Sequence, residues 1–299
     1  MRRTTWVWFV LGIVWGSTWL FIKLGLEQIP PFTLAGLRFA CAAVAMWALL
    51  AVRRVHLPRA GRDWILMIGT GWLTFGLDYG LVFWGESHIP AGLTSILFST
   101  MPLFVLVLAH VLVPAERMTT RKLLGILIGI GGVALIFSQQ TGISDGMALW
   151  GSVAVLAGAA FAALSSVLIR RSGGHLDPMV LTTVQMTAGC LPLLLVGRLL
   201  EGSATSFHWT PMAWVSLLYM AFVGSAMAFV LLYWLLRRIG AVRSGLIIPF
   251  STVVAVLLGV AVLGEAFTWQ IAVGGLLVMV GLAAASRPQQ ATAPRPTGL

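Results

Sequence analysis

The sequence has few charged residues. Of its 299 residues, 9% are charged and 59% are hydrophobic. About one quarter of the residues in a soluble domain are charged, because charged side chains cover the surface that faces water. This composition excludes a soluble globular enzyme and a disordered chain. It is typical of a protein that crosses a membrane several times.

The sequence also lacks the residues that most cofactor and metal sites need. It has two cysteines, Cys41 and Cys190, and both lie in apolar stretches. A zinc site or a disulfide framework requires more thiols, or histidines at ligand spacing. No phosphate-binding GxxxxGK(S/T) motif occurs, so the chain is not expected to use ATP. We therefore expect no metal, no cofactor and two unreactive buried thiols.

Long apolar stretches account for most of the chain. A helix of about 20 apolar residues crosses the hydrocarbon core of a bilayer. The stretch after Met1 is too long for a signal peptide and no cleavage site follows it, so it is expected to be the first span. The sequence predicts an all-α integral membrane protein with ten transmembrane helices, at residues 6–26, 32–52, 64–84, 91–112, 121–138, 147–169, 178–198, 211–236, 244–263 and 268–286.

Lysine and arginine are distributed unevenly between the predicted loops. If the N-terminus is cytoplasmic, all but three of the 19 basic residues fall on the cytoplasmic side, and the outer loops hold only Arg198. Positive residues favour the cytoplasmic side of a membrane. We expect a plasma-membrane protein, in the inner membrane of a bacterium, with both termini cytoplasmic. The net charge of +10 is then a topology signal and does not indicate a nucleic-acid partner.

The chain resembles itself at a shift of about 149 residues. At that shift Glu116 aligns with Glu265, and Gly125 aligns with Gly274. The sequence predicts two halves of five spans each, 1–140 and 141–286, and a disordered cytoplasmic tail at 287–299. Because five is odd, the second half crosses the membrane in the opposite direction. Inverted repeats of this kind are typical of secondary transporters, whose substrate site lies between the halves near the bilayer midplane.

Three segments resemble the EamA-type transporters of the drug/metabolite transporter superfamily. They are WGSTWLFIKLGLEQIPPFTLAGLRF at 15–39, PLFVLVLAHVLVPAERMTTRKLLGILIGIGGVALI at 102–136 and AVRSGLIIPFSTVVAVLLGVAVLGEAFTWQIAVGGLLVMVGL at 241–282. The resemblance implies a bundle of two inverted five-helix repeats around a cavity that faces mainly helices 1, 3, 4, 6, 8 and 9. It also implies export or import of small metabolites, often amino acids. One departure is Ser251, which stands where the match to Pro102 requires proline, with Pro249 two residues earlier.

Three charged residues, Lys23, Arg38 and Asp78, fall inside the predicted spans more than two residues from a span end. Burial of such a group costs free energy, so each is a candidate functional residue. Asp78, whose partner in the second half is Ala228, could carry a proton or hold a substrate ammonium group. It could instead form a structural ion pair with Arg38 or Lys23, and the sequence leaves both interpretations open. Arg38 is otherwise expected to order the first two spans, and Lys23 to reach the outer interface.

Aromatic and hydroxyl side chains are expected to form the walls of the cavity. An apolar wall with a few polar groups suits an amphipathic solute, and the alternative for each aromatic is plain helix packing. Pro102 and Pro249 are expected to remove backbone hydrogen bonds in the middle of spans and to act as hinges. The predicted substrate-binding residues are Trp15, Trp19, Asp78, Tyr79, Phe83, Ser95, Ser99, Phe161, Ser165, Tyr219, Phe229, Tyr233 and Ser244.

These features predict a secondary transporter that exports amino acids or related amphipathic solutes by alternating access. A passive channel or facilitator is the alternative, although a channel would need rings of charges or carbonyl groups. A membrane-embedded enzyme would need a cluster of catalytic groups, so no enzyme activity is expected. The expected partners are a small-molecule substrate and the lipid bilayer, and protons and a second copy of the chain are candidates.

Overall fold

The computed structural model describes residues 2–113, 118–140 and 146–286, and most of them are helical. The helices of the first half are α1 (Arg2–Leu26), α2 (Pro31–Val52), α3 (Gly61–Gly71), η1 (Trp72–Asp78), α4 (Tyr79–His88), α5 (Ala91–Phe98), α6 (Met101–Leu112) and α7 (Thr120–Gln140). Those of the second half are α8 (Gly146–Ser172), α9 (Pro178–Leu200), η2 (Ala204–Ser206), α10 (Pro211–Leu218), η3 (Tyr219–Met227), α11 (Ala228–Gly245), α12 (Ile247–Leu263) and α13 (Trp269–Ser286).

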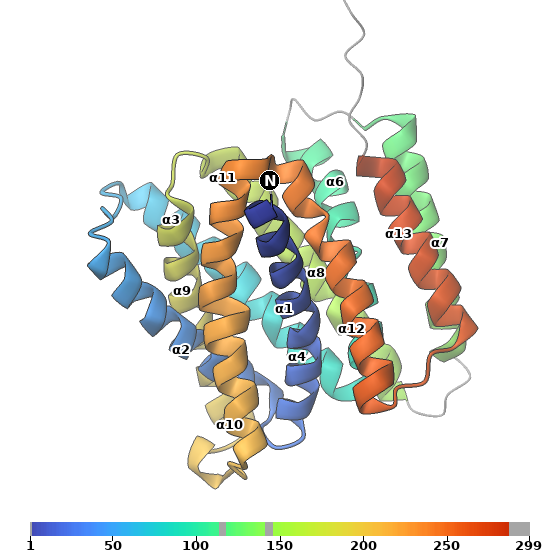
Figure 1. Cartoon of the computed structure of the whole chain (residues 1–299), viewed down its shortest axis with the longest axis horizontal. Helices are drawn as coiled ribbons and strands as arrows, with labels where there is room; N and C mark the ends of the chain where they lie inside the picture. The colour runs from blue at the N-terminus through green and yellow to red at the C-terminus, as the bar shows by residue number, and fades with distance from the viewer. Residues whose placement is uncertain (1, 114–117, 141–145, 287–299) are drawn as a thin grey trace, which may run out of the picture.

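The described helices form a bundle of membrane spans (Figure 1). Eight spans are long and apolar enough to cross a bilayer, and the shorter apolar helices Ile247–Leu263 and Trp269–Ala285 complete a set of ten. Large apolar side chains are exposed along the bundle, with Trp6 at 71% and Leu199 at 72%. Exposure on this scale suits a lipid environment. The predicted fold class, an all-helical membrane protein with ten spans, is confirmed.

The helices of the two halves pack in matched pairs. α1 packs along α12, and in the same way α8 packs along α5 and α6. α4 and η1 contact α8, and α11 and η3 contact α1. α2 pairs with α9, and α7 runs beside α13 at one edge of the bundle (Figure 1). Exchange of the two halves turns the contacts of α1 into those of α8 and leaves the α2–α9 and α7–α13 pairs unchanged, as expected for inverted repeats.

A stretch of π-helix interrupts the corresponding span of each half. η1 lies in the third span between α3 and α4, and η3 lies in the eighth between α10 and α11. π-Helical turns are rare and often mark functional sites. The backbones pack closely at η1, because a Cβ atom added to Gly189 of α9 would lie 2.6 Å from the carbonyl carbon of Phe75. A larger residue at this position would push α9 away from η1.

The predicted fourth span is confirmed at Ala91–Leu112, although its helix is interrupted between Phe98, where α5 ends, and Met101, where α6 begins. One prediction, the position of the prolines within their helices, is corrected. Pro102 is the second residue of α6 and Pro249 the third residue of α12, so neither proline removes a bond from the middle of a helix. The first four N–H groups of a helix lack partners in any case. The predicted tail at 287–299, and residues 141–145 at the predicted boundary between the halves, lie outside the described residues.

The two ends of the bundle differ in charge. The end at which α1 begins is called the basic end, because Arg53, Arg54, Arg59 and Arg62 lie there between α2 and the start of α3. The opposite end is the one at which α1 stops. There Glu265 accepts hydrogen bonds from the first backbone N–H groups of α5, and so caps a helix of the other half.

Candidate functional site

A cavity of about 250 Å³ lies between the two halves, midway along several spans. Both halves contribute to its walls. From the first half come Trp15, Thr18, Trp19, Ile22, Arg38, Thr74, Asp78, Tyr79, Val82, Ser95, Phe98, Ser99 and Met101. From the second half come Ala162, Ser166, Phe229, Ile248, Ser251 and Thr252. The cavity thus brings together eight of the predicted residues: Trp15, Trp19, Arg38, Asp78, Tyr79, Ser95, Ser99 and Phe229.

Aromatic rings form much of the wall. The rings of Trp15 and Phe229 lie 6.1 Å apart across the boundary between the halves. The rings of Trp19 and Phe98 lie 5.6 Å apart. The first pair meets edge to face and the second is tilted, and aromatic rings at such separations attract each other weakly and hold their positions in a packed wall. The cavity therefore offers a rigid apolar surface to the hydrocarbon part of a solute.

Asp78 is the acid of the cavity. It is the last residue of η1 and is 1% exposed. Its Oδ1 atom has no hydrogen-bond partner, and among the described residues no ion pair joins it to Arg38 or Lys23. The absence of a side chain at Gly158 in α8 leaves room for it, since a Cβ atom there would lie 3.0 Å from Oδ1. The carboxyl group is thus buried without a protein partner and faces the cavity.

Arg38 is the cation of the cavity. It is 3% exposed, and its Nε donates a hydrogen bond of 3.1 Å to Oγ of Ser225 in η3. Its Nη1 has no hydrogen-bond partner within the described chain. The guanidinium carbon lies 5.0 Å from the ring centre of Phe39 and 5.2 Å from that of Tyr79, at cation–π distance. Arg38 was expected to order the first two spans, but its hydrogen bond joins the first half to the second.

The hydroxyl groups of Ser95 and Ser99 in the cavity are already engaged with the backbone. Oγ of Ser95 donates to the carbonyl of Gly92 at 2.7 Å, and Oγ of Ser99 donates to that of Ile96 at 2.6 Å. A hydroxyl that donates within its own helix still has lone pairs that can accept. These serines can therefore accept a hydrogen bond from a solute, but they offer it no free donor.

Several predicted residues lie outside the cavity in this conformation. The hydroxyl of Tyr219 is 2.6 Å from Oγ of Ser17, and the hydroxyl of Tyr233 is hydrogen-bonded to Thr182. Both tyrosines thus tie α1 or α9 to the eighth span. The predicted residues that do not line the cavity are Phe83, Phe161, Ser165, Tyr219, Tyr233 and Ser244.

Lys23 lies at the opposite end of the bundle, away from the cavity. Its Nζ donates to the backbone carbonyls of Glu86 at 2.7 Å and Ile89 at 2.9 Å. This fastens α1 to the corner between α4 and α5. Together with Glu265, Lys23 also lines a surface hollow of about 300 Å³. The predicted position near the end of its span holds, but the ammonium group binds the backbone of another span.

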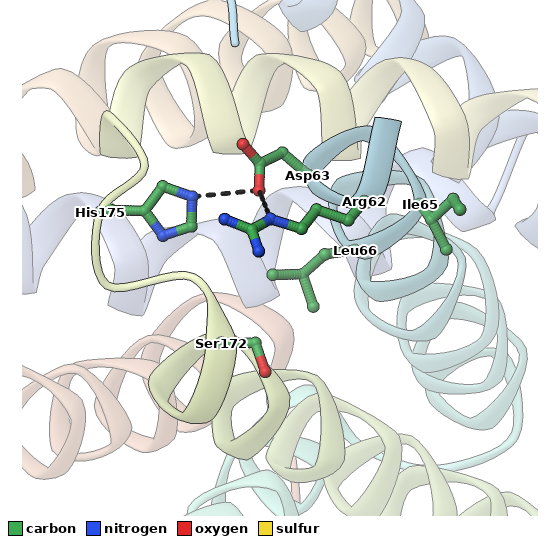
Figure 2. Close-up of a pocket in the computed structure, with 6 residues that line it drawn as sticks. All are labelled: Arg62, Asp63, Ile65, Leu66, Ser172 and His175. Atoms are coloured by element: carbon green, nitrogen blue, oxygen red, sulfur yellow. Dashed lines mark hydrogen bonds and ion pairs between the residues drawn. The ribbon is translucent and has the colours of Figure 1, made fainter. Parts of the chain in front are cut away.

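The halves are also joined at the basic end (Figure 2). Asp63 in α3 and His175, between α8 and α9, approach to 3.0 Å between Oδ1 and Nε2. Nε of the exposed Arg62 lies 3.9 Å from the same oxygen. Figure 2 shows that both side chains point at this one carboxylate oxygen. The connection between α8 and α9 is therefore held to the start of α3.

Sequence reasoning missed two buried acids, Asp63 and Glu86, and several cavity residues. Glu86 is 0% exposed, but the predicted third span stopped at residue 84, which put Glu86 in a loop. The helix continues to His88. A check for charged residues within one turn of each predicted span end would have found it. Nothing in the sequence marked Thr252 or Ser166 as cavity residues, because that depends on how each helix is rotated in the bundle.

A bundle of ten apolar spans around a solute-sized cavity is the architecture of a membrane transporter. The chain matches the EamA-like transporter family twice, over residues 4–138 and 149–287. The protein therefore belongs to the EamA-like transporter family, and the predicted resemblance is confirmed.

Relatives across bacteria have similar lengths and are named as transporters. The uncharacterised transporter YoaV of Bacillus subtilis is 30% identical over 274 residues, which cover 90% of this chain and 92% of YoaV. A protein of Salmonella typhimurium described as a probable amino-acid metabolite efflux pump is 30% identical over 94% of each chain. A solved crystal structure with 21% identity has a similar fold, with a TM-score of 0.66 over 95% of this chain and 97% of its own.

Proposed function

We propose that the protein is a secondary transporter that exports amino acids or related amphipathic metabolites by alternating access. The observation that carries this proposal is the pair of buried charged groups without ionic partners, Asp78 and Arg38, which line the same cavity. An amino acid offers an ammonium group to the carboxylate and a carboxylate to the guanidinium, and such charge-assisted hydrogen bonds are strong. The aromatic rings of Trp15 and Phe229 would face its side chain.

The size of the cavity supports a small solute. Its volume of about 250 Å³ is below that of pockets for drug-sized ligands, which run from roughly 300 to 1,000 Å³. A single amino acid fits this space better than a large apolar drug. The name of the Salmonella relative, a probable amino-acid metabolite efflux pump, agrees with this substrate class.

Alternating access would use the contacts between the halves at each end. Asp63 and His175 join the halves at the basic end, and Glu265 bridges to α5 at the opposite end. We propose that the halves 1–140 and 141–286 rock against each other, so that one set of contacts breaks while the other holds. The distribution of lysine and arginine supports a plasma-membrane orientation in which the basic end and both termini are cytoplasmic.

Asp78 would alternate between two ligands. In the loaded state its carboxylate binds the substrate ammonium group, and in the empty return state the same carboxyl carries a proton. A buried carboxyl without a partner needs one or the other, because a bare charge in an apolar site is unfavourable. Competition between the two ligands would couple export of the solute to entry of a proton.

Counterflow in proteoliposomes tests the proposal. Vesicles loaded with an unlabelled amino acid should accumulate the labelled one transiently, without ATP, because a carrier exchanges solute across the membrane. Equilibration without transient accumulation would indicate a facilitator or channel instead. Failure to move any member of a broad amino-acid and metabolite panel would contradict the proposed function.

A further inference from the structure

A second buried carboxyl, that of Glu86, lies outside the cavity described above. Glu86 is in α4 and is 0% exposed, and neither of its carboxylate oxygens has a hydrogen-bond partner in the described chain. An ionised carboxylate in such a place would lose its hydration and gain nothing in return. The carboxyl group of Glu86 is therefore expected either to be protonated or to bind a cation that moves close to it.

The charged groups around Glu86 are all engaged elsewhere. Those that act on its carboxyl are Lys23 from α1, Glu265 from the connection between α12 and α13, and Arg38 from α2. Glu265 accepts from the backbone N–H groups of α5, and Arg38 donates to Ser225. Lys23 is bonded to the backbone carbonyls of Glu86 and Ile89 and not to the carboxylate. Glu86 thus has a cation beside it but no hydrogen bond to that cation.

Lys23 has two competing sets of acceptors. The carbonyls that it binds lie at the end of α4, where the last carbonyl groups of a helix have no partner within the helix. A cation is favourable there. An ionised Glu86 carboxylate would be a stronger acceptor than a neutral carbonyl. In this conformation Lys23 binds the two backbone carbonyls and not the carboxyl group of Glu86, as expected when Glu86 is neutral.

Glu86 also lies between the cavity and the opposite end of the bundle. It follows Asp78 by eight residues in the same span, which is about 12 Å along a helix. Beyond it, Lys23 and Glu265 line the surface hollow at that end. A proton that enters the hollow would meet Glu86 before it reaches Asp78.

We propose that Glu86 is a second proton-binding site of the transport path, an inference that rests on the proposed function. In the conformation seen here the carboxyl holds a proton. When it releases that proton to water at the opposite end, the ammonium group of Lys23 leaves the carbonyls of Glu86 and Ile89 and binds the new carboxylate. Lys23 then leaves the carbonyl of Ile89, so α1 is no longer held to the corner before α5, but it stays joined to α4 through the carboxylate of Glu86.

Infrared spectroscopy of the purified full-length protein in lipid vesicles tests the protonation directly. At neutral pH we expect a carbonyl-stretch absorption of protonated carboxyls, measured in an Asp78→Asn background so that Asp78 does not contribute, and this band should be lost when Glu86→Gln is added. The matched control is Glu27→Gln, the same change at an exposed residue of the same hollow, which should keep the band. An identical band with and without Glu86→Gln in this background would overturn the proposal.

A second variant decides the matter if Glu86→Gln does not fold. In Lys23→Gln an ionised Glu86 loses the cation beside it, so its band should persist at alkaline pH values at which the unchanged protein has lost it. Loss of the band at the same pH in both proteins would contradict the role of Lys23 and the proposal.

Counterflow measured against pH tests the place of Glu86 in transport. Glu86→Gln should flatten the pH dependence of exchange, and Glu27→Gln should leave it unchanged. A pH profile of Glu86→Gln that matches the unchanged protein would overturn the role in the transport path. The infrared experiment needs no substrate, so a protein that moves no solute would contradict the proposed function without deciding the protonation of Glu86.

Discussion

The two halves of the chain pack their spans in the same way but differ in buried charge. Among the described residues every buried charged side chain belongs to the first half: Arg38, Asp63, Asp78 and Glu86. At a shift of 150 residues the positions of the three acids are taken in the second half by Ala213, Ala228 and Leu236, and at a shift of 147 that of Arg38 is taken by Gln185. The same helix arrangement is thus built once with buried charges and once without them.

The difference in buried charge distinguishes residues that the bundle needs for folding from residues that it needs for function. Since the second half packs its matched contacts with apolar or neutral residues, this architecture does not need buried charges for its stability. Buried ionisable groups in a membrane are unfavourable and are usually associated with function. The charges of the first half are therefore the best candidates for substrate and proton binding.

The largest effect is expected from loss of the acid in the cavity. Asp78→Asn keeps the shape of the side chain but can no longer carry a negative charge. Gradient-driven export should fall at least tenfold, because a hydrogen bond to a charged group contributes about 1.5–3 kcal/mol. When the solution outside the vesicles is acidified, the unchanged protein should export its substrate faster. The export rate of Asp78→Asn should not change. Asp78→Glu is the control and should retain a response to the pH gradient.

Loss of the cation should separate substrates by their carboxylate. Arg38→Gln should raise the KM for amino acids about tenfold, but should affect the corresponding amines without a carboxylate much less. The matched change in the second half is Gln185→Leu, which removes a hydrogen bond of 2.9 Å to Thr70. That variant should lower stability and leave substrate preference intact. Equal losses for amino acids and amines in Arg38→Gln would remove the case for carboxylate binding.

α7 of the first half and α13 of the second half pack closely against each other, and variants at this contact test whether that close packing stabilises the protein. A Cβ atom on Gly132 would lie 2.5 Å from the carbonyl oxygen of Gly274, whereas Gly131 has nothing within 4 Å. Gly132→Leu should destabilise the protein by about 1–3 kcal/mol, read as a lower melting temperature in detergent. Gly131→Leu is the matched control and should melt like the unchanged protein. Similar melting of both variants would show that the close packing is absent.

A smaller effect is expected from the aromatic wall. Trp15→Ala enlarges the cavity beside Phe229 and should shift the preference several-fold toward bulkier amino acids, at normal abundance of the protein. Competition assays with amino acids of increasing size measure this shift. A fall in abundance with an unchanged order of preference would mean that Trp15 serves packing alone.

The smallest effect is expected from Ser99→Ala. The hydroxyl of Ser99 donates to the carbonyl of Ile96 in its own chain segment, so its removal should change KM by less than about fivefold. A large loss of transport would show that this hydroxyl turns toward the solute during the cycle.

The sequence predicted the fold well, because the length and polarity of the apolar stretches determine the spans. Trp15 and Trp19 were also placed correctly at the cavity, since residues four apart share a helix face. Tyr219 and Tyr233 were expected at the cavity but lie outside it; Tyr219 is the first residue of the π-helix η3, and Tyr233 lies in α11, which follows it. A π-helical turn contains extra residues, so it rotates the faces of the helix in a way that a regular pattern does not reveal.

Proton movement during exchange is the most direct test of the assignment of function to the charges of the first half. Proteoliposomes that enclose a pH indicator receive an amino acid on one side, in the absence of an imposed gradient. We predict a substrate-dependent change of internal pH with the unchanged protein, and none with Asp78→Asn at equal amounts of protein. Equal proton movement in both would contradict the account.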